Sequence, residues 1–255
     1  MMINYTVISD RDNKKRRKLV YNEFYKIGIE EPNFTDAIMA TRMNDKEVYA
    51  HTIANTFLSK GEVGCALSHK KVYEEFLRTN ENSIAIFEDD IKFSDECTIE
   101  TIKKIMGIVN HMTRPAVVVL QKSIYHHKKL HNVKDNLFIY SARNLFCTHG
   151  YIINRAGAES ILKVQSPIRF EIDAFKFYYW LGALDLFCLN EDLVIQDEAQ
   201  VSNIKAERHE VYNRTALKNK AYKELYTELP CKQKVQAQLK RLSKVLYKPF
   251  ESLEY

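Results

Sequence analysis

Glycine and proline are scarce in this sequence, and it has no long hydrophobic run. The chain has 7 glycines and 5 prolines among 255 residues, which excludes the collagen-like and low-complexity classes. Its most apolar stretch, residues 177–189, is too short to cross a bilayer and contains Asp185. The first ten residues lack the basic start and apolar core of a signal peptide, so we expect no export. With 45% hydrophobic residues, the composition is that of a globular protein with a substantial core.

The cysteines do not form a recognisable framework. They are odd in number, widely spaced and without a C-x-x-C pair: Cys65, Cys97, Cys147, Cys188 and Cys231. This pattern predicts neither a disulfide scaffold nor a thiolate zinc site. We therefore expect a reducing, cytoplasmic setting.

Positive charge is concentrated at the C-terminal end. Residues 231–255 contain six basic and two acidic side chains, which account for most of the formal net charge of +5. Val235, Leu239, Leu242 and Leu246 recur at the spacing of one helical stripe. The basic residues of the proposed surface are Lys234, Lys240, Arg241, Lys244 and Lys248.

Two interpretations of this C-terminal helix remain open. A basic amphipathic helix suits an anionic membrane surface, where apolar burial and attraction to acidic headgroups act together. Alternatively, the leucines pack on the protein body and leave the lysines in solvent. No binding motif for nucleic acid accompanies the charge, so we expect no nucleic-acid partner.

Strands that alternate with helices predict an α/β fold with a mostly parallel sheet flanked by helices. Residues 4–9 are typical of a first strand, and residues 61–78 repeat apolar side chains at helical spacing. The short apolar runs 83–87 and 116–120 are typical of strands buried on both faces. Further strands are expected at 136–141 and 151–154, and helices at 98–110, 156–164 and 173–184. We predict one domain over residues 1–230, followed by the basic tail 231–255.

Three consecutive carboxylates, Glu88, Asp89 and Asp90, end the strand 83–87. Open α/β sheets bind ligands at the carboxyl ends of their strands, so these side chains stand where a ligand is expected. Adjacent anions are costly to desolvate unless a cation neutralises them. Oxygen ligands favour Mg²⁺ or Mn²⁺, which indicates a nucleotide-diphosphate site. The alternative is a solvated acidic turn.

Several stretches in one order resemble glycosyltransferase family 25, the bacterial lipopolysaccharide hexosyltransferases. They are FTDAI (34–38), LSKGEVGCALSHKKVYEEFL (58–77), IAIFEDDIKF (84–93), HGYIINRAGAESIL (149–162), IDAF (172–175) and LVIQ (193–196). The resemblance implies a GT-A-like, Rossmann-type domain and a UDP-hexose donor, commonly UDP-galactose. It also implies a divalent metal and transfer with inversion to a lipopolysaccharide or lipooligosaccharide acceptor at the inner face of the cytoplasmic membrane.

The resemblance also suggests roles for individual residues. Glu88 and Asp90 would hold the metal ion, whose charge stabilises the departing UDP, and Asp89 would serve as a ribose or outer ligand. Asp173, in the I-D-x-F context, would be the base that takes the proton from the acceptor hydroxyl. The alternatives for the base are Asp185, Glu171 and Asp192, and Asp173 could instead cap a helix.

Four further residues are candidates for the donor site: Arg16, Glu62, His149 and Gln196. Glu62 could instead cap the helix that it opens. His69 shares an apolar stripe with Cys65, so we expect a hydrogen-bonded core histidine, and the pair His126-His127 is expected in a solvated loop. Two rival functions remain: a non-catalytic membrane-surface saccharide-binding module, and a nucleotide-sugar phosphohydrolase.

Overall fold

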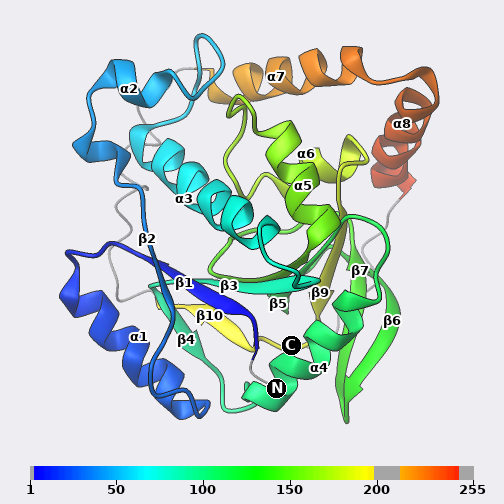
Figure 1. Cartoon of the computed structure of the whole chain (residues 1–255). Coiled ribbons are helices and arrows are strands. Elements are labelled where there is room, and N and C mark those ends of the chain that lie inside the picture. Colours follow the sequence, from blue (N-terminus) through cyan, green and yellow to red (C-terminus); the bar gives the residue numbers. More distant parts are fainter. Residues whose placement is uncertain (1–2, 198–212, 247–255) are drawn as a thin grey trace.

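The computed structural model describes residues 3–197 and 213–246, without the side chains of 243–246 (Figure 1). An eight-stranded sheet with the order β2-β1-β3-β8-β5-β9-β7-β6 forms its centre. The strands are β1 (Tyr5–Ser9), β2 (Phe34–Asp36), β3 (Ser83–Glu88), β5 (Ala116–Lys122), β6 (His126–Lys134), β7 (Leu137–Ala142), β8 (Gly150–Asn154) and β9 (Asp185–Leu189). Within the described residues, β7 and β8 run against the other six strands of this sheet. The predicted α/β fold with a mostly parallel sheet is confirmed.

Helices cover both faces of the sheet (Figure 1). One face packs against α3 (Lys60–Leu77), α5 (Arg155–Val164), α6 (Phe175–Trp180) and α7 (Arg214–Glu228). The other face packs against α1 (Lys14–Lys26), α4 (Ile99–Asn110) and a small antiparallel sheet of β4 (Ile91–Phe93) and β10 (Val194–Gln196). The remaining helical segments are η1 (Ala40–Arg42), α2 (Asp45–Tyr49) and α8 (Cys231–Leu246). The strand β3 is therefore buried on both sides, as its apolar sequence predicts.

Local capping and close packing hold the start of α3 against the segment around Ile38. The Ser59 side chain accepts a hydrogen bond from the Glu62 backbone, and the Glu62 carboxylate accepts one from the Ser59 backbone. This reciprocal pair satisfies two donors at the helix start. A Cβ atom at Gly64 would lie 2.6 Å from the Ile38 carbonyl oxygen, so only glycine allows α3 to approach this segment so closely.

Two predictions about local structure are wrong. His126 and His127 lie in β6, an exposed strand at the edge of the sheet, and not in a loop. Because β6 is largely solvated, its sequence lacks the apolar alternation of a half-buried strand. The aromatic helix expected at 173–184 is limited to α6, because a turn around Gly182, with φ of +71°, leads into β9.

The helix α8 is attached to the body by the face opposite its apolar stripe. Ala237 is buried, the Lys240 ammonium lies 4.3 Å from the Tyr179 ring centre, and the Arg241 guanidinium lies over Trp180. In contrast, Val235, Leu239 and Leu242 are 60%, 61% and 57% exposed. The interpretation in which this stripe packs on the body is wrong for these three residues.

The sequence predicts an exposed surface for all the basic residues of the C-terminal helix. In the structure, some of them contact the protein body instead. Lys240 also lies 3.6 Å from Asp185, so it and Arg241 serve the attachment of the helix. Lys234 is half-buried, whereas the Lys244 side chain and Lys248 lie outside the described residues. Among the described residues, no helix is long and apolar enough to cross a membrane.

Candidate functional site

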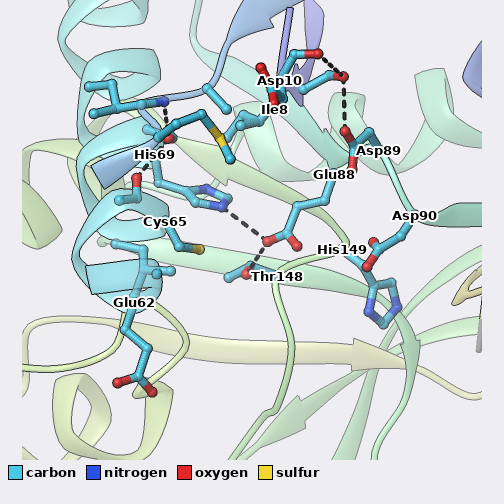
Figure 2. A pocket seen from close by; sticks show the side chains of 18 of the residues that line it. Ile8, Asp10, Glu62, Cys65, His69, Glu88, Asp89, Asp90, Thr148 and His149 are labelled. Carbon is cyan, nitrogen blue, oxygen red and sulfur yellow. Dashed lines mark hydrogen bonds and ion pairs between the residues drawn. The ribbon is translucent and has the colours of Figure 1, made fainter. Parts of the chain in front are cut away.

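A cavity of about 390 Å³ opens at the carboxyl ends of β1 and β3 (Figure 2). The start of α3, residues 37–41, the segment before β8 and residues 171–173 form much of the rest of its wall. Because β8 runs antiparallel to β3, its first residue, Gly150, pairs with Phe87 near the end of β3. This pairing brings Thr148 and His149 to the same edge as the acidic triplet. All the carboxylates of that triplet line the cavity, which agrees with the expected place of a ligand.

Glu88 points toward α3 and is held there by two donors. Its Oε1 atom accepts hydrogen bonds from His69 Nε2 at 3.2 Å and from the Thr148 hydroxyl. Burial opposes ionisation of Glu88, but the bonds from His69 and Thr148 outweigh it and hold its pKa below the usual range. The other ring nitrogen of His69 lies 2.7 Å from the Tyr151 hydroxyl. His69 is therefore the hydrogen-bonded core histidine that its position predicts.

Asp89 joins the end of β1 to the first turn of α1. Its Oδ2 atom accepts a hydrogen bond from Ser9 at 2.9 Å, and its Oδ1 atom accepts one from Arg16 at 2.7 Å. The Arg16 guanidinium is thereby fixed at the cavity wall, where it adds positive charge. Both oxygens of Asp89 are therefore engaged in holding Ser9 and Arg16. The expectation that Asp89 does not bind the metal ion directly stays a prediction.

Asp90 is the member of the triplet with a buried oxygen that has no hydrogen-bond partner among the described residues. Its Oδ2 atom accepts a hydrogen bond from Gln196 Nε2 at 2.8 Å, while its buried Oδ1 atom has no hydrogen-bond partner in the described part of the chain. Burial and the neighbouring Glu88 raise the pKa of Asp90 to about 6. An unpartnered buried carboxylate oxygen fits a cation, because a positive ion would satisfy it and favour its charged form.

His149 also lines this part of the cavity. Its Nε2 atom lies 3.2 Å from the Val194 carbonyl oxygen of β10. The Cβ of an alanine at Gly150 would meet the Val194 side chain at 2.7 Å, so glycine is required for β8 to begin this close to β10. Burial lowers the pKa of His149.

A second group of possible metal-binding atoms lies beside the triplet. The ligand atoms of Cys65, His69 and Glu88 all lie within 4.8 Å of one another. Here, however, His69 and Glu88 already bond each other, and Tyr151 takes the second nitrogen of His69. Asp90 therefore fits a cation better than this group does.

Of the four candidate bases, two line the cavity and two do not. Asp173 and Glu171 line the cavity. Asp185 instead pairs with Arg114 at 2.9 Å, and Asp192 accepts a hydrogen bond from the Lys122 backbone; neither is among the residues that line it. Asp173 does not cap α6, because the capping residue is Ala174 and no side-chain cap bond is made.

Glu171 is neutralised by two cations from α7. Its Oε1 atom lies 2.6 Å from Arg214 and 2.7 Å from Lys218. Burial opposes its ionisation, but these cations outweigh it and hold the pKa of Glu171 below the usual range. A carboxylate stabilised in this way is a poor proton acceptor, which leaves Asp173 as the other candidate for the base that lines the cavity.

The capping role weighed for Glu62 from the sequence is confirmed, and its donor-site role stays a prediction. Glu62 caps α3, lines the cavity and pairs with Arg214 at 2.5 Å. Arg214 thus bonds both Glu62 and Glu171. It lies 152 residues after Glu62, so sequence spacing could not indicate this contact. Ser9 and Thr148 were missed as well, since isolated hydroxyl residues give no pattern.

Comparisons with known proteins identify the family to which this chain is similar. The family model "Glycosyltransferase family 25 (LPS biosynthesis protein)" matches residues 2–176. A putative glycosyltransferase of Haemophilus influenzae is 29% identical over 205 residues, which cover 76% of this chain and 70% of that protein.

Two mammalian relatives are matched over a smaller share of their length. Human procollagen galactosyltransferase 2 is 24% identical over 63% of this chain, and mouse inactive glycosyltransferase 25 family member 3 is 27% identical over 51%. The chain covers 26% and 24% of their respective lengths. Relatives of this chain thus include proteins named as active and as inactive.

Proposed function

Because the chain belongs to glycosyltransferase family 25, we propose that it transfers galactose or glucose from a UDP-sugar to a lipopolysaccharide or lipooligosaccharide acceptor. The proposed transfer depends on Mn²⁺ or Mg²⁺ and inverts the anomeric centre. The observation that carries this proposal is the buried, unpartnered Oδ1 atom of Asp90 at the carboxyl end of β3. Such an atom, in a cavity that also holds an arginine and two further carboxylates of the triplet, fits a cation and a diphosphate.

Asp90 would hold the cation, with Glu88 on the same side of the cavity. When bound, the cation supplies positive charge that stabilises the diphosphate as it departs. Arg16 adds a second positive charge to the donor site, and its bond to Asp89 fixes the guanidinium before the donor arrives. Glu62 and Gln196 border the same space.

Asp173 would act as the base. It accepts the proton of the acceptor hydroxyl while the oxygen attacks the anomeric carbon of the donor. The bond from that carbon to the diphosphate breaks as the new glycosidic bond forms on the opposite face, and UDP leaves. Direct displacement of this kind inverts the anomeric centre.

Product analysis separates this function from its two rivals. A transferase without an acceptor slowly hydrolyses UDP-galactose or UDP-glucose to UDP and free hexose, whereas a phosphohydrolase yields UMP and hexose 1-phosphate. A saccharide-binding module yields neither. We expect UDP release that requires Mn²⁺, disappears with EDTA and is lost in Asp90→Asn.

The matched control is Asp185→Asn, which removes a carboxylate outside the cavity and should leave UDP release unchanged. Full activity in Asp90→Asn would refute the role of Asp90 in holding the cation. UMP as the product would favour the phosphohydrolase.

We further propose that the protein is a cytoplasmic enzyme, peripheral to the inner face of the cytoplasmic membrane. The observation that favours this is the apolar stripe of α8, formed by Val235, Leu239 and Leu242, which points away from the body. The exposed Lys232 and the half-buried Lys234 add positive charge on the same helix. Apolar side chains and lysines on one surface helix suit an anionic lipid surface.

A further inference from the structure

Among the described residues that line the cavity, three buried side chains each have one polar atom without a hydrogen-bond partner: Asp90 at Oδ1, His149 at Nδ1 and Glu171 at Oε2. The charge of Glu171 is already neutralised by Arg214 and Lys218, which leaves Asp90 and His149. Asp90 is 6% and His149 5% exposed, and both line the cavity. An unsatisfied buried acceptor costs about 1–3 kcal/mol, so two such atoms at one site indicate a ligand that would satisfy both.

The hydrogen bond of His149 fixes which of its nitrogens can accept. A carbonyl oxygen only accepts, so the Nε2 atom that faces Val194 carries the proton, and Nδ1 carries a lone pair. Histidines that bind metals usually donate their other N–H to a carbonyl or carboxylate, as His149 does here.

The strand β10 holds both side chains at this place. The Val194 carbonyl anchors His149, and the Gln196 side chain, two residues later, anchors Asp90. Figure 2 shows the Asp90 carboxylate and the His149 ring as neighbours on one side of the cavity. His69 offers no such atom, because both of its ring nitrogens are engaged.

We propose that His149 Nδ1 is a ligand of the divalent cation, together with Asp90 Oδ1. This inference rests on the metal dependence in the proposed function and adds a nitrogen ligand to it. Mg²⁺ accepts an imidazole nitrogen less readily than Mn²⁺ does, because it is the smaller cation and keeps to oxygen ligands and water. The protein therefore prefers Mn²⁺ to Mg²⁺, and His149 contributes to this preference.

Electron spin echo envelope modulation tests the ligand directly, because it detects a nitrogen bound to Mn²⁺. We expect ¹⁴N modulation in the full chain loaded with Mn²⁺ and UDP. His149→Gln, whose amide can still donate to the Val194 carbonyl, should lose the modulation and bind Mn²⁺ at least about tenfold more weakly in calorimetry. His131→Gln, which changes an exposed histidine of β6, should alter neither.

The outcomes separate this inference from the proposed function. Mn²⁺ binding without ¹⁴N modulation, or with modulation that survives in His149→Gln, overturns the His149 ligand and leaves metal-dependent transfer intact. Failure of Mn²⁺ to bind with UDP contradicts both. If the variant does not fold, the wild-type chain labelled with ¹⁵N-histidine decides, because a histidine ligand must then replace the ¹⁴N modulation by that of ¹⁵N.

Discussion

Neighbouring carboxylates of one triplet have different capacities to bind a ligand. Glu88 is held by His69 and Thr148, and Asp89 by Ser9 and Arg16, whereas Asp90 has a buried oxygen without a hydrogen-bond partner among the described residues. The sequence predicts that all three lie at the carboxyl end of a strand, because they directly follow an apolar run typical of a buried strand in an α/β fold. Their different environments come from partners up to 106 residues away, which no local pattern reveals.

Ionised Asp90 lowers the free energy of unfolding of the metal-free protein. Its pKa of about 6 in the folded protein lies above the ordinary value of an aspartate, about 3.9, so ionised Asp90 destabilises the folded state. This destabilisation is absent below about pH 4, grows between pH 4 and 6, and is complete above pH 6. Asp90→Asn should therefore raise the stability of the metal-free protein by about 1–3 kcal/mol at pH 7.

Urea unfolding of both proteins in EDTA measures this difference as a function of pH. The gain in Asp90→Asn should vanish at pH 4. A variant that is less stable than the wild type at pH 7 would contradict the assignment of an unsatisfied carboxylate at this position.

Asp173 is predicted to affect turnover and not donor binding. Asp173→Asn keeps the size of the side chain but cannot accept the acceptor's proton, so kcat for transfer should fall by about 10²–10⁴-fold. Calorimetry should give an unchanged affinity for UDP with Mn²⁺. Asp192→Asn, which lies outside the cavity lining, is the matched control, and a normal rate in Asp173→Asn would move the base to Glu171.

At the scale of elements, α7 supports the site from outside the region that the family model matches. Arg214 lies at its first residue and bridges two buried carboxylates, Glu62 and Glu171. Removal of one partner from a buried ion pair typically costs about 3–5 kcal/mol, because the other charge is left uncompensated.

Arg214→Met should accordingly lower the free energy of unfolding by about 3–5 kcal/mol, measured by urea denaturation. Arg114→Met is the control, because Arg114 pairs with Asp185 at the surface, where such a pair contributes about 0–1 kcal/mol. Equal losses in the two variants would show that the Arg214 bridge does not stabilise the fold.

The periodicity of α8 predicts its apolar stripe but not the direction in which the stripe points. That direction depends on aromatic side chains of α6 and α7, which hold Lys240 and Arg241 from the other side. A sequence stripe is compatible with either arrangement, and only the packing of the body separates them.

Replacement of Val235, Leu239 and Leu242 by serine should weaken binding to vesicles that contain anionic lipid and leave the melting temperature unchanged, since these side chains are exposed. Vesicle co-sedimentation measures the first and calorimetry the second. Ile124→Ser, which removes another exposed apolar residue, is the control. Unchanged vesicle binding in the triple variant would contradict the membrane-facing stripe.

The elements that sequence predicts best are the buried ones. The apolar runs of β3 and β5 are strands, and α3, α4 and α5 lie within one or two residues of their expected bounds. The direction of β8 was not predictable, because parallel and antiparallel strands buried on both faces have the same apolar pattern. That direction matters, since it brings His149 beside the acidic triplet.

At the scale of the whole molecule, the fold gathers one cavity from segments that span most of the chain. The opening strand supplies Ser9, the triplet begins at the last residue of β3, and Gln196 is the last residue of β10, beyond the matched residues 2–176. A separate hydrophobic cluster packs on each face of the sheet, and both clusters support the sheet edge at which the cavity opens. The resemblance points to the acidic triplet and to Gln196 as site residues. The bonds that α7 makes to Glu62, and that β10 makes to Asp90 and His149, emerge only from tertiary structure.

The most direct test of the central claim is the thermal stability of the wild-type protein and Asp90→Asn with UDP-galactose or UDP-glucose, with and without Mn²⁺. A ligand at 100 times its Kd stabilises the folded state by about 2.7 kcal/mol. We predict a rise in melting temperature for the wild type that requires both Mn²⁺ and a UDP-hexose and is absent in Asp90→Asn. An equal rise in both proteins, or none with either sugar, would contradict a metal-dependent donor site at Asp90.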